Sequence, residues 1–481
     1  MTNVDRSAPR RRLKLRDGVR IEFGVSADNA VTARSRDGAL SLGASTSALR
    51  EALGLLAEGA DEEEAASAVA EKEGLQALAR WSWLTQTLLD MGCLRYALAS
   101  AAGEPLATIF ALAPGPSIRL SPLRSSDAVA LSRFAWLHAA GGVTVLESPL
   151  GRARVELDDP RLAGAVAALA RPQTANQLAD SLGLCVETVA GFLGFLQGAR
   201  ALAAPGEMDG SCGLAFWEVQ DALFHVHSRL GRRDRAYGAT YRFQGRIPPP
   251  PAVAPVEGPV VPLATPDFNK LRANDLPFAK VLDARRSLRK FSPAPVDVAT
   301  LSEFLYRSAR NTGLSAQPMQ EGAEREFDRI TRPYPGAGGC HPLDVYVVAR
   351  RCEGLERGLY RYEPAGHALI ALAADPCRLD RLLAEARSAA RIEENPPVLV
   401  VLAARFLRAL WKYEGIGYAN LLKDVGALLQ TMYLVATAMG LAPCALGGGD
   451  AECFADAAGL AFWEETSVGE FMLGHPARGV I

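Results

Sequence analysis

A proline-rich segment near the middle of the chain limits the fold more than any other feature of the sequence. Seven prolines lie between Pro248 and Pro262, and the first four are consecutive. Proline fixes φ and has no N–H, so this segment cannot form a helix interior or a central strand. We therefore interpret residues 246–275 as a stiff, polyproline-like linker that wraps over the surface. The 481 residues are too many for one ordinary core, which agrees with folded parts on both sides of the linker.

Composition excludes several classes of protein. The net charge of −2 argues against a general nucleic-acid binder, which would be strongly basic. The sequence contains no run of about 18 apolar residues, so it predicts no membrane span. The polar, basic N-terminus does not resemble a secretory signal. The eight cysteines are scattered without a C-x-x-C pair. This predicts reduced thiols, a cytoplasmic protein and no metal site.

The part of the chain before the linker shows one pattern twice, which predicts two tandem winged-helix-like modules over residues 1–115 and 116–245. The second module includes a connecting helix over 216–230. In the first module, an Asp17-Gly18 turn predicts a hairpin over Leu13–Phe23. The other expected elements are helices at 46–58, from 61 and at 75–91, strands at 93–98 and 106–112, a second hairpin at 143–157, and helices at 162–169, 174–181 and 186–198.

The charge of the third helix of each module bears on what the modules bind. Residues 75–91 contain Arg80 as their only cation, and residues 186–198 contain none. DNA-binding helices need cations for phosphate contacts, so a DNA-binding winged helix is disfavoured. Two alternatives stay open, because the modules could bind a peptide as an added strand on a sheet edge or could only support an enzyme.

The segment that follows the linker has the chemistry of a phosphate site. In extended chain, Arg285, Ser287 and Arg289 fall on one side, because side chains alternate at period two. Two guanidinium groups and a hydroxyl on one side suit a phosphate monoester. The alternative is a solvated basic turn, since short basic runs are common.

Residues 276–481 resemble the nitroreductase superfamily, and within it the SagB/ThcOx-type azoline dehydrogenases. The resemblance begins with the R-R-S-x-R-x-F pattern of Arg285–Phe291. It continues in the same order through 333–342, which precedes a strand at 343–348, then through 358–362, Lys412-Tyr413 and 445–450. The resemblance implies an α+β fold in which a mixed sheet is flanked by helices. The strands are expected at 343–348, 358–362, 369–372 and 398–402, and the helices at 297–309, 379–389 and 416–439.

The same resemblance implies the activity and the site residues. Such enzymes use FMN to oxidise thiazoline or oxazoline rings of ribosomal peptides to thiazoles or oxazoles, and oxygen reoxidises the flavin. Lys412 and Tyr413 are the implied catalytic pair, one of which takes the Cα proton while hydride passes to flavin N5. The implied cofactor-binding residues are Arg285, Arg286, Ser287, Arg289, Gly338, Gly339, Gln430, Gly447 and Gly448.

Other implications concern partners and alternatives. The family forms homodimers through the helix at 416–439, and the N-terminal modules resemble elements that take a leader peptide, so a peptide substrate and a cyclodehydratase partner are expected. One alternative is an NAD(P)H-dependent reductase of small molecules. Another is an inactive scaffold that binds the leader peptide and the cyclodehydratase. The polar stretch at 317–332 is interpreted as a lid near the flavin.

Overall fold

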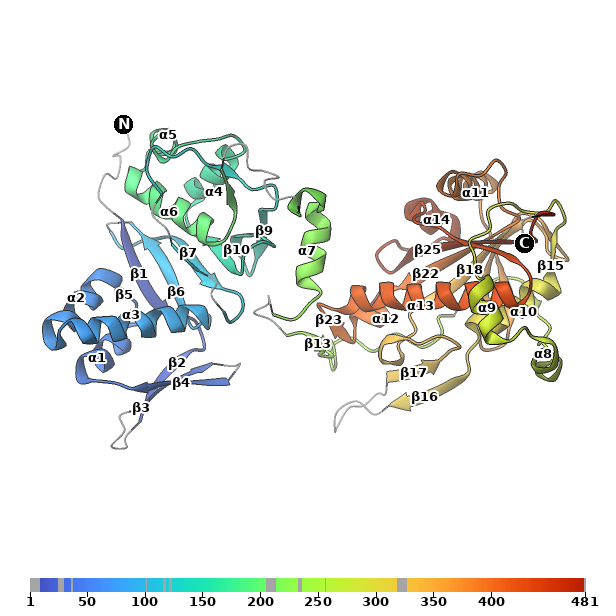
Figure 1. Cartoon of the computed structure of the whole chain (residues 1–481), viewed down its shortest axis with the longest axis horizontal. Coiled ribbons are helices and arrows are strands. Elements are labelled where there is room, and N and C mark those ends of the chain that lie inside the picture. The colour runs from blue at the N-terminus through green and yellow to red at the C-terminus, as the bar shows by residue number, and fades with distance from the viewer. Residues whose placement is uncertain are drawn as a thin grey trace. The chain divides into compact units, whose positions relative to one another are not determined.

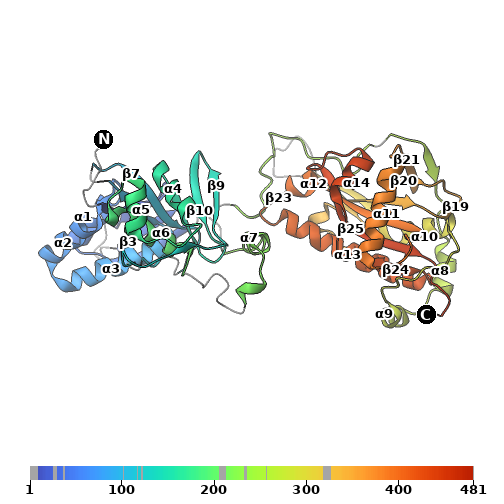
Figure 2. The same cartoon turned by 90° about the horizontal axis from the view of Figure 1, so that it is seen from above.

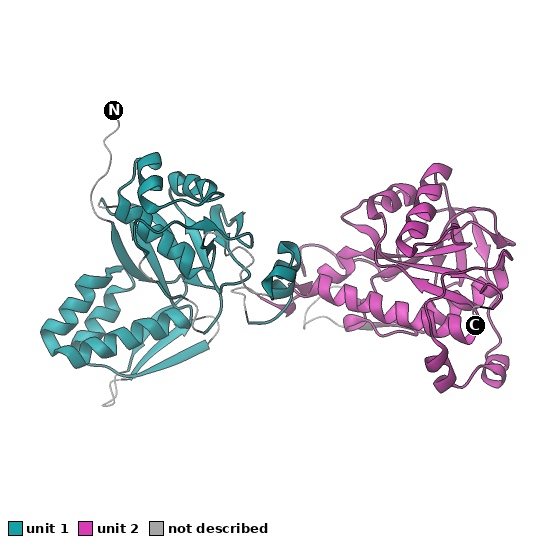
Figure 3. Ribbon diagram, turned by 45° about the horizontal axis from the view of Figure 1, so that its top comes forward, with its two compact units in different colours: residues 1–235 teal, residues 236–481 magenta. Residues whose placement is uncertain are grey.

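The computed structural model describes residues 9–24, 30–35, 38–100, 102–115, 118–120, 123–204, 213–231, 236–255, 257–317 and 327–479. The chain forms two compact units, residues 1–235 and 236–481 (Figure 3). The division therefore lies ten residues before the expected start of the linker, and the proline-rich segment belongs to the second unit. In the described part of the chain, no helix is long and apolar enough to cross a membrane.

One antiparallel sheet of seven strands runs through the first unit (Figure 1). The sheet is continuous across the expected module boundary at residue 115, because β7 of the first half pairs with β11 of the second half. The winged-helix assignment of either half stays a prediction. In spatial order the strands are β5 (Ala60–Asp61), β1 (Arg10–Leu15), β6 (Leu94–Ala99), β7 (Pro105–Ala111), β11 (Ala153–Leu157), β10 (Val143–Glu147) and β9 (Trp136–Ala140).

Six helices of the first unit lie where the sequence predicts them. Side-chain caps fix the starts of five of them and not of α3, which begins after Gly74: for example, Thr46 and Asp61 accept backbone N–H groups, and Thr174 forms a capping box with Gln177. The helices build two separate apolar cores, one around Trp81 and the other around Phe192. They are α1 (Ser47–Leu55), α2 (Glu62–Glu73), α3 (Leu75–Asp90), α4 (Pro160–Ala168), α5 (Ala175–Leu182) and α6 (Val186–Gly198).

The hairpin expected over Leu13–Phe23 is wrong. Both strands exist, but β1 pairs with β5 on one edge and with β6 on the other. No full edge of β1 is left for β2 (Arg20–Phe23). The chain reverses at Gly18, whose φ is +80°, and β2 instead pairs with β3 (Ala30–Ser35) in a three-stranded sheet with β4 (Gly38–Ala44). The hairpin at 143–157 is confirmed as β10 and β11.

The second unit is built on another seven-stranded sheet (Figures 1 and 2). The sequence predicts a mixed sheet, but all six pairings within it are antiparallel. Short connections join β18, β20 and β21, and such connections join antiparallel neighbours. In spatial order the strands are β14 (Val260–Pro262), β21 (Ala368–Leu372), β20 (Gly358–Glu363), β18 (Leu343–Ala349), β22 (Val398–Arg405), β25 (Glu465–Gly474) and β24 (Ala442–Ala445).

Helices cover both faces of this sheet. Val345 and Val347 of β18 pack in the core with α10 (Val298–Ala309) and α13 (Gly417–Ala438). Tyr346 and Val348 pack on the opposite face with α11 (Pro376–Ala390) and α14 (Ala451–Ala458). Burial on both faces explains why β22 is apolar from Val398 to Ala404 and why Asp344 is the only charged residue of β18. The long helix predicted at 416–439 is confirmed as the central helix α13.

Buried arginines hold the proline-rich segment against the second unit. Arg408 Nη1 donates to the carbonyl of Pro250 at 2.9 Å, and Arg405 donates to the carbonyls of Pro251 and Ala252 at 2.7 and 3.0 Å. Prolines lack an N–H, but their carbonyls are available to guanidinium donors. The segment then adds β14 to the edge of the sheet beside β21.

Candidate functional site

The Arg285–Phe291 segment follows α9 (Phe278–Ala284) and lies beside the turn of α13 that carries Tyr433. Leu288 N donates to Pro443 O of β24 at 2.8 Å, which fixes the segment along that strand. Ser287 Oγ lies 2.7 Å from Tyr433 Oη, and Tyr433 Oη accepts from Ala445 N at 2.8 Å. The Arg285 guanidinium lies over the Tyr433 ring, 5.3 Å from its centroid. Tyr433, which the sequence interpretation missed, therefore organises this end of the site.

The three arginines of the segment have different surroundings. Arg286 Nη1 donates to Asp283 O and Ala284 O at 3.1 and 3.2 Å, so it caps the C-terminus of α9. Arg289 lies beside Cys444 of β24, where it opposes the rise in the pKa of the thiol that burial causes. Within the described chain, neither Arg285 nor Arg289 has an acidic partner. The two cations, Arg285 and Arg289, together with the Ser287 hydroxyl fit a phosphate group as their counter-ion. The Arg286 side chain is instead held at the end of α9.

A glycine loop forms the second end of the site. Ala337–Gly339 is a short 3₁₀ turn in which Gly338 and Gly339 have φ of +58° and +70°. Lys412 Nζ donates to Gly338 O at 2.8 Å. A Cβ added to Gly338 would overlap the Tyr413 hydroxyl and would lie 2.7 Å from Lys412 Nζ. The structure thus brings together the glycine loop and the Lys412–Tyr413 pair, which are separate motifs in the sequence.

The pKa values at the loop show which groups are charged. Burial is the largest cause that raises the pKa of Tyr413 to about 12; the charges of Cys340, Tyr241 and Asp424 contribute to the rise, and Arg329 opposes it. Burial lowers the pKa of His341 to about 4, with Arg332 and Arg408 adding to the effect. At neutral pH the phenol of Tyr413 is therefore protonated and the imidazole of His341 is neutral.

Asp424 is a site residue that the sequence interpretation missed. It lies on α13, is 5% exposed, and accepts Ala337 N on its two carboxylate oxygens at 3.0 and 3.2 Å. Burial raises its pKa to about 6, while the hydrogen bond from Ala337 N and the charge of Lys423 oppose the rise. A signal exists in the sequence, because Asp424 stands at a core-facing position between Leu421 and Leu428.

Similarity to known proteins agrees with this geometry. Residues 282–475 match the model of the nitroreductase family. Residues 282–475 of the second unit form a nitroreductase-family domain. Residues 129–234 match the family model of the cyanobactin oxidase ThcOx.

Two relatives and one solved structure are similar to parts of the chain. "Putative nitroreductase MJ1384" of Methanocaldococcus jannaschii is 27% identical over 194 residues, which are 40% of this chain and 85% of that protein. The microcin B17-processing protein McbC of Escherichia coli is 30% identical over 118 residues, which are 23% of this chain and 42% of McbC. The solved structure is the E. coli microcin synthetase McbBCD complex with truncated pro-MccB17 bound. The match to one chain of this structure covers 40% of the present chain and 70% of that chain, at 24% sequence identity and a TM-score of 0.32.

Three further residues assigned to the cofactor lie on the surface of the nitroreductase domain. Gln430 is exposed on α13, one turn before Tyr433. Gly447 and Gly448 are exposed after β24, and a Cβ added to either would meet no atom within 4 Å. The structure brings none of the three to Lys412, and their assignment stays a prediction. Nine residues of α13 separate Asp424 from Tyr433, which places the two ends of the site about 14 Å apart along the helix.

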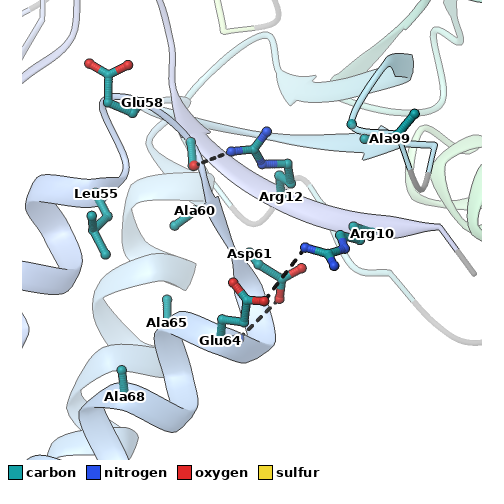
Figure 4. Close-up of a pocket in the computed structure, with 13 residues that line it drawn as sticks. Arg10, Arg12, Leu55, Glu58, Ala60, Asp61, Glu64, Ala65, Ala68 and Ala99 are labelled. Atoms are coloured by element: carbon teal, nitrogen blue, oxygen red, sulfur yellow. Dashed lines mark hydrogen bonds and ion pairs between the residues drawn. The ribbon is translucent and has the colours of Figure 1, made fainter.

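A separate cavity lies in the first unit, beside the short edge strand β5 (Figure 4). Its volume is about 600 Å³. Four of the charged side chains on its wall are paired with nearby groups: Arg12 donates to Gly59 O at 2.7 Å, Arg10 lies 3.8 Å from Glu64, and Asp61 caps α2. The cavity shares no residue with the site in the nitroreductase domain.

Proposed function

We propose that the protein is an FMN-dependent azoline dehydrogenase that oxidises thiazoline or oxazoline rings of a ribosomally made peptide to thiazoles or oxazoles. The observation that carries the proposal is the cluster of Lys412, Tyr413 and Asp424 on one glycine loop, at the opposite end of α13 from the phosphate-binding residues. The matches to the ThcOx model and to McbC, a microcin-processing protein, support a peptide substrate.

Arg285, Ser287 and Arg289 would hold the phosphate of FMN through charge-assisted hydrogen bonds. FMN, when bound, would supply the acceptor for the hydride that leaves the ring carbon next to Cα. The exposed backbone of Gly447 and Gly448 leaves room for a planar ring, because no side chain covers it.

The Cα proton needs an acceptor in its deprotonated form. With a pKa of about 12 for Tyr413, the tyrosinate is about 10⁻⁴ of the population at pH 8, whereas Asp424, with a pKa of about 6, is about 99% ionised. We therefore assign proton acceptance to Asp424. Lys412 and Tyr413 act as hydrogen-bond donors that stabilise the negative charge developing on the azoline when the proton leaves. The sequence interpretation placed the base on Lys412 or Tyr413, and this division of roles differs from it.

The same proposal implies a leader peptide, a cyclodehydratase and a second copy of the chain as partners. The cavity beside β5 offers room at a sheet edge where a leader peptide could add as a strand. A cyclodehydratase would supply the azoline. Tyr418 and Leu422 are exposed on α13 at 43% and 38%, which supports a homodimer through this helix.

The experiment is single-turnover oxidation of an azoline-containing peptide by the FMN-reconstituted protein, followed by mass spectrometry. The expected result is the loss of two hydrogen atoms per ring and bleaching of the flavin absorbance before oxygen is admitted. Tyr413→Phe should keep FMN and lower the rate roughly 10²–10³-fold, as the loss of one donor to a developing negative charge does. Similarity to MJ1384 favours a reductase as the second candidate, so NADPH-dependent reduction of a nitroaromatic without azoline oxidation would replace the proposal.

A further inference from the structure

A short segment that both family matches leave out lies against the catalytic pair. The matches end at residue 234 and begin again at residue 282, and β13 (Gly238–Ala239) falls between them. β13 pairs with β23 (Tyr413–Glu414), and Tyr241 N donates to Lys412 O at 3.2 Å. Thr240 Oγ1 adds a hydrogen bond to Glu414 Oε2 at 3.2 Å. The backbone of residues 412–414 is thus held by residues 238–241.

Aromatic rings surround the side chain of Lys412. Its Nζ lies 5.7 Å from the ring centroid of Tyr241, 5.3 Å from that of Phe327 and 5.5 Å from that of Tyr413. The lysine is 5% exposed, donates to Gly338 O and, among the described residues, has no ion pair. Ring faces attract the amino group of a lysine. The three rings therefore hold Lys412 Nζ in place beside the Gly338 carbonyl.

Tyr241 adopts an uncommon backbone conformation to make this contact. Its φ is +50°, in the left-handed region that non-glycine residues rarely occupy. Such a conformation persists only where the surroundings fix it, and it concentrates at functional sites. Here the ring packs edge-on against Trp411 at 5.9 Å, and Trp411 Nε1 donates to Ile247 O at 2.8 Å.

We propose that Tyr241 is a positioning residue of the dehydrogenase: its ring, together with that of Phe327, fixes Lys412 Nζ at the Gly338 carbonyl, beside the Tyr413 hydroxyl. The role in turnover rests on the proposed function, whereas the placement of Lys412 does not. The aromatic face carries the effect, because in the described part of the structure the Tyr241 hydroxyl has no hydrogen-bond partner.

Three variants of the full chain test the proposal. Tyr241→Leu removes the ring, and Tyr241→Phe keeps the ring without the hydroxyl. Phe243→Leu is the matched control, because Phe243 belongs to the same aromatic cluster but, among the described residues, is not one of the rings that lie over Lys412 Nζ. Melting temperature and bound flavin are measured for each variant, so that a loss of folding is recognised.

The first readout is NMR of lysine-labelled protein. The chain has seven lysines, so the Lys412 signal can be identified as the one missing from Lys412→Arg. The Lys412 side-chain protons should be shifted upfield by the surrounding rings in the wild type, in Tyr241→Phe and in Phe243→Leu, and should move toward random-coil values in Tyr241→Leu. An unshifted signal in a folded wild type would overturn the placement of Lys412, whatever the substrate.

The second readout is azoline oxidation. Tyr241→Leu should lower kcat about 100-fold with KM nearly unchanged, since a displacement of about 1 Å in a catalytic group has that effect. Tyr241→Phe should restore kcat to within about threefold of wild type, consistent with a ring-face interaction. A kcat in Tyr241→Leu equal to that of Phe243→Leu, or no rescue by Tyr241→Phe, would refute the positioning role. If the wild type itself does not oxidise azolines, the proposed function fails, while the NMR result still decides the placement of Lys412.

Discussion

Gly338→Ala is the substitution whose effect the structure defines most closely. Gly338 has φ of +58°, and an alanine in that conformation costs about 1–2 kcal/mol. In a unit of this size, such a loss lowers the melting temperature by about 2–8 °C. The added Cβ would also overlap the Tyr413 hydroxyl and approach Lys412 Nζ to 2.7 Å. The loop and the catalytic pair must therefore separate by about 1 Å, which predicts a loss of about 100-fold in turnover.

Gly339→Ala provides the matched control for this prediction. Gly339 has φ of +70°, so the backbone penalty is similar. Its Cβ would lie 2.9 Å from Arg329 Nε, which can rotate away, and 3.2 Å from Arg329 Cβ, which must give by a few tenths of an ångström; its three nearest atoms all belong to Arg329 and none to Tyr413 or Lys412. Both variants should lose similar stability, and Gly338→Ala alone should lose most of its turnover of an azoline peptide. Equal activity of the two folded, flavin-loaded variants would show that the fit of Tyr413 against Gly338 does not matter.

Three further predictions concern the cofactor, the proton acceptor and the assembly. Arg285→Ala combined with Arg289→Ala should weaken FMN binding at least 100-fold, since each charge-assisted contact is worth about 1.5–3 kcal/mol; fluorescence titration measures the change, and unchanged affinity would contradict the phosphate assignment. The wild-type rate should rise with pH through about 6 as Asp424 loses its proton, and this step should be absent from the residual rate of Asp424→Asn. The pKa of Asp424 in the folded protein exceeds its unfolded value near 3.9, so the carboxylate destabilises the fold above about pH 6 and not below pH 4. The difference in melting temperature between Asp424→Asn and the wild type should therefore be more favourable to the variant at pH 8 than at pH 4. Leu422→Glu should convert a wild-type dimer to a monomer in light scattering, and a flavin-loaded wild type that is already monomeric at micromolar concentration would contradict the dimer.

Local signals made much of the fold predictable. Helix caps and helical periodicity located the six helices of the first unit and α13, because both signals depend on residues within one or two turns. Strand pairing depends on distant residues, which explains the failure at Leu13–Phe23: the partner of β1 is β6, about 80 residues further along the chain. The turn sequence alone could not reveal that competition.

The candidate site likewise has residues that the sequence can group and contacts that only the fold reveals. Arg285, Ser287 and Arg289 could be grouped from their spacing, since they are neighbours in the chain. The contact between Lys412 and Gly338 joins residues 74 positions apart, and only the fold shows it. Arg286 was assigned by its place in the motif, but the C-terminal carbonyls of α9 bind its side chain.

The arginines that bind the proline-rich segment set the limits of the smallest piece of this protein that can stand alone. Arg408 is completely buried, and part of its hydrogen bonding comes from Pro250, which precedes the family match by some thirty residues. A shortened chain that begins at residue 282 would keep the acceptors of Nε and Nη2, Cys340 O and Asp328 O, but would leave Nη1 of this buried guanidinium without its acceptor, a costly state for a charge. It would also remove β13 from beside Lys412 and Tyr413. Exchange of this domain between proteins, by recombination or by design, therefore requires a junction upstream of residue 236.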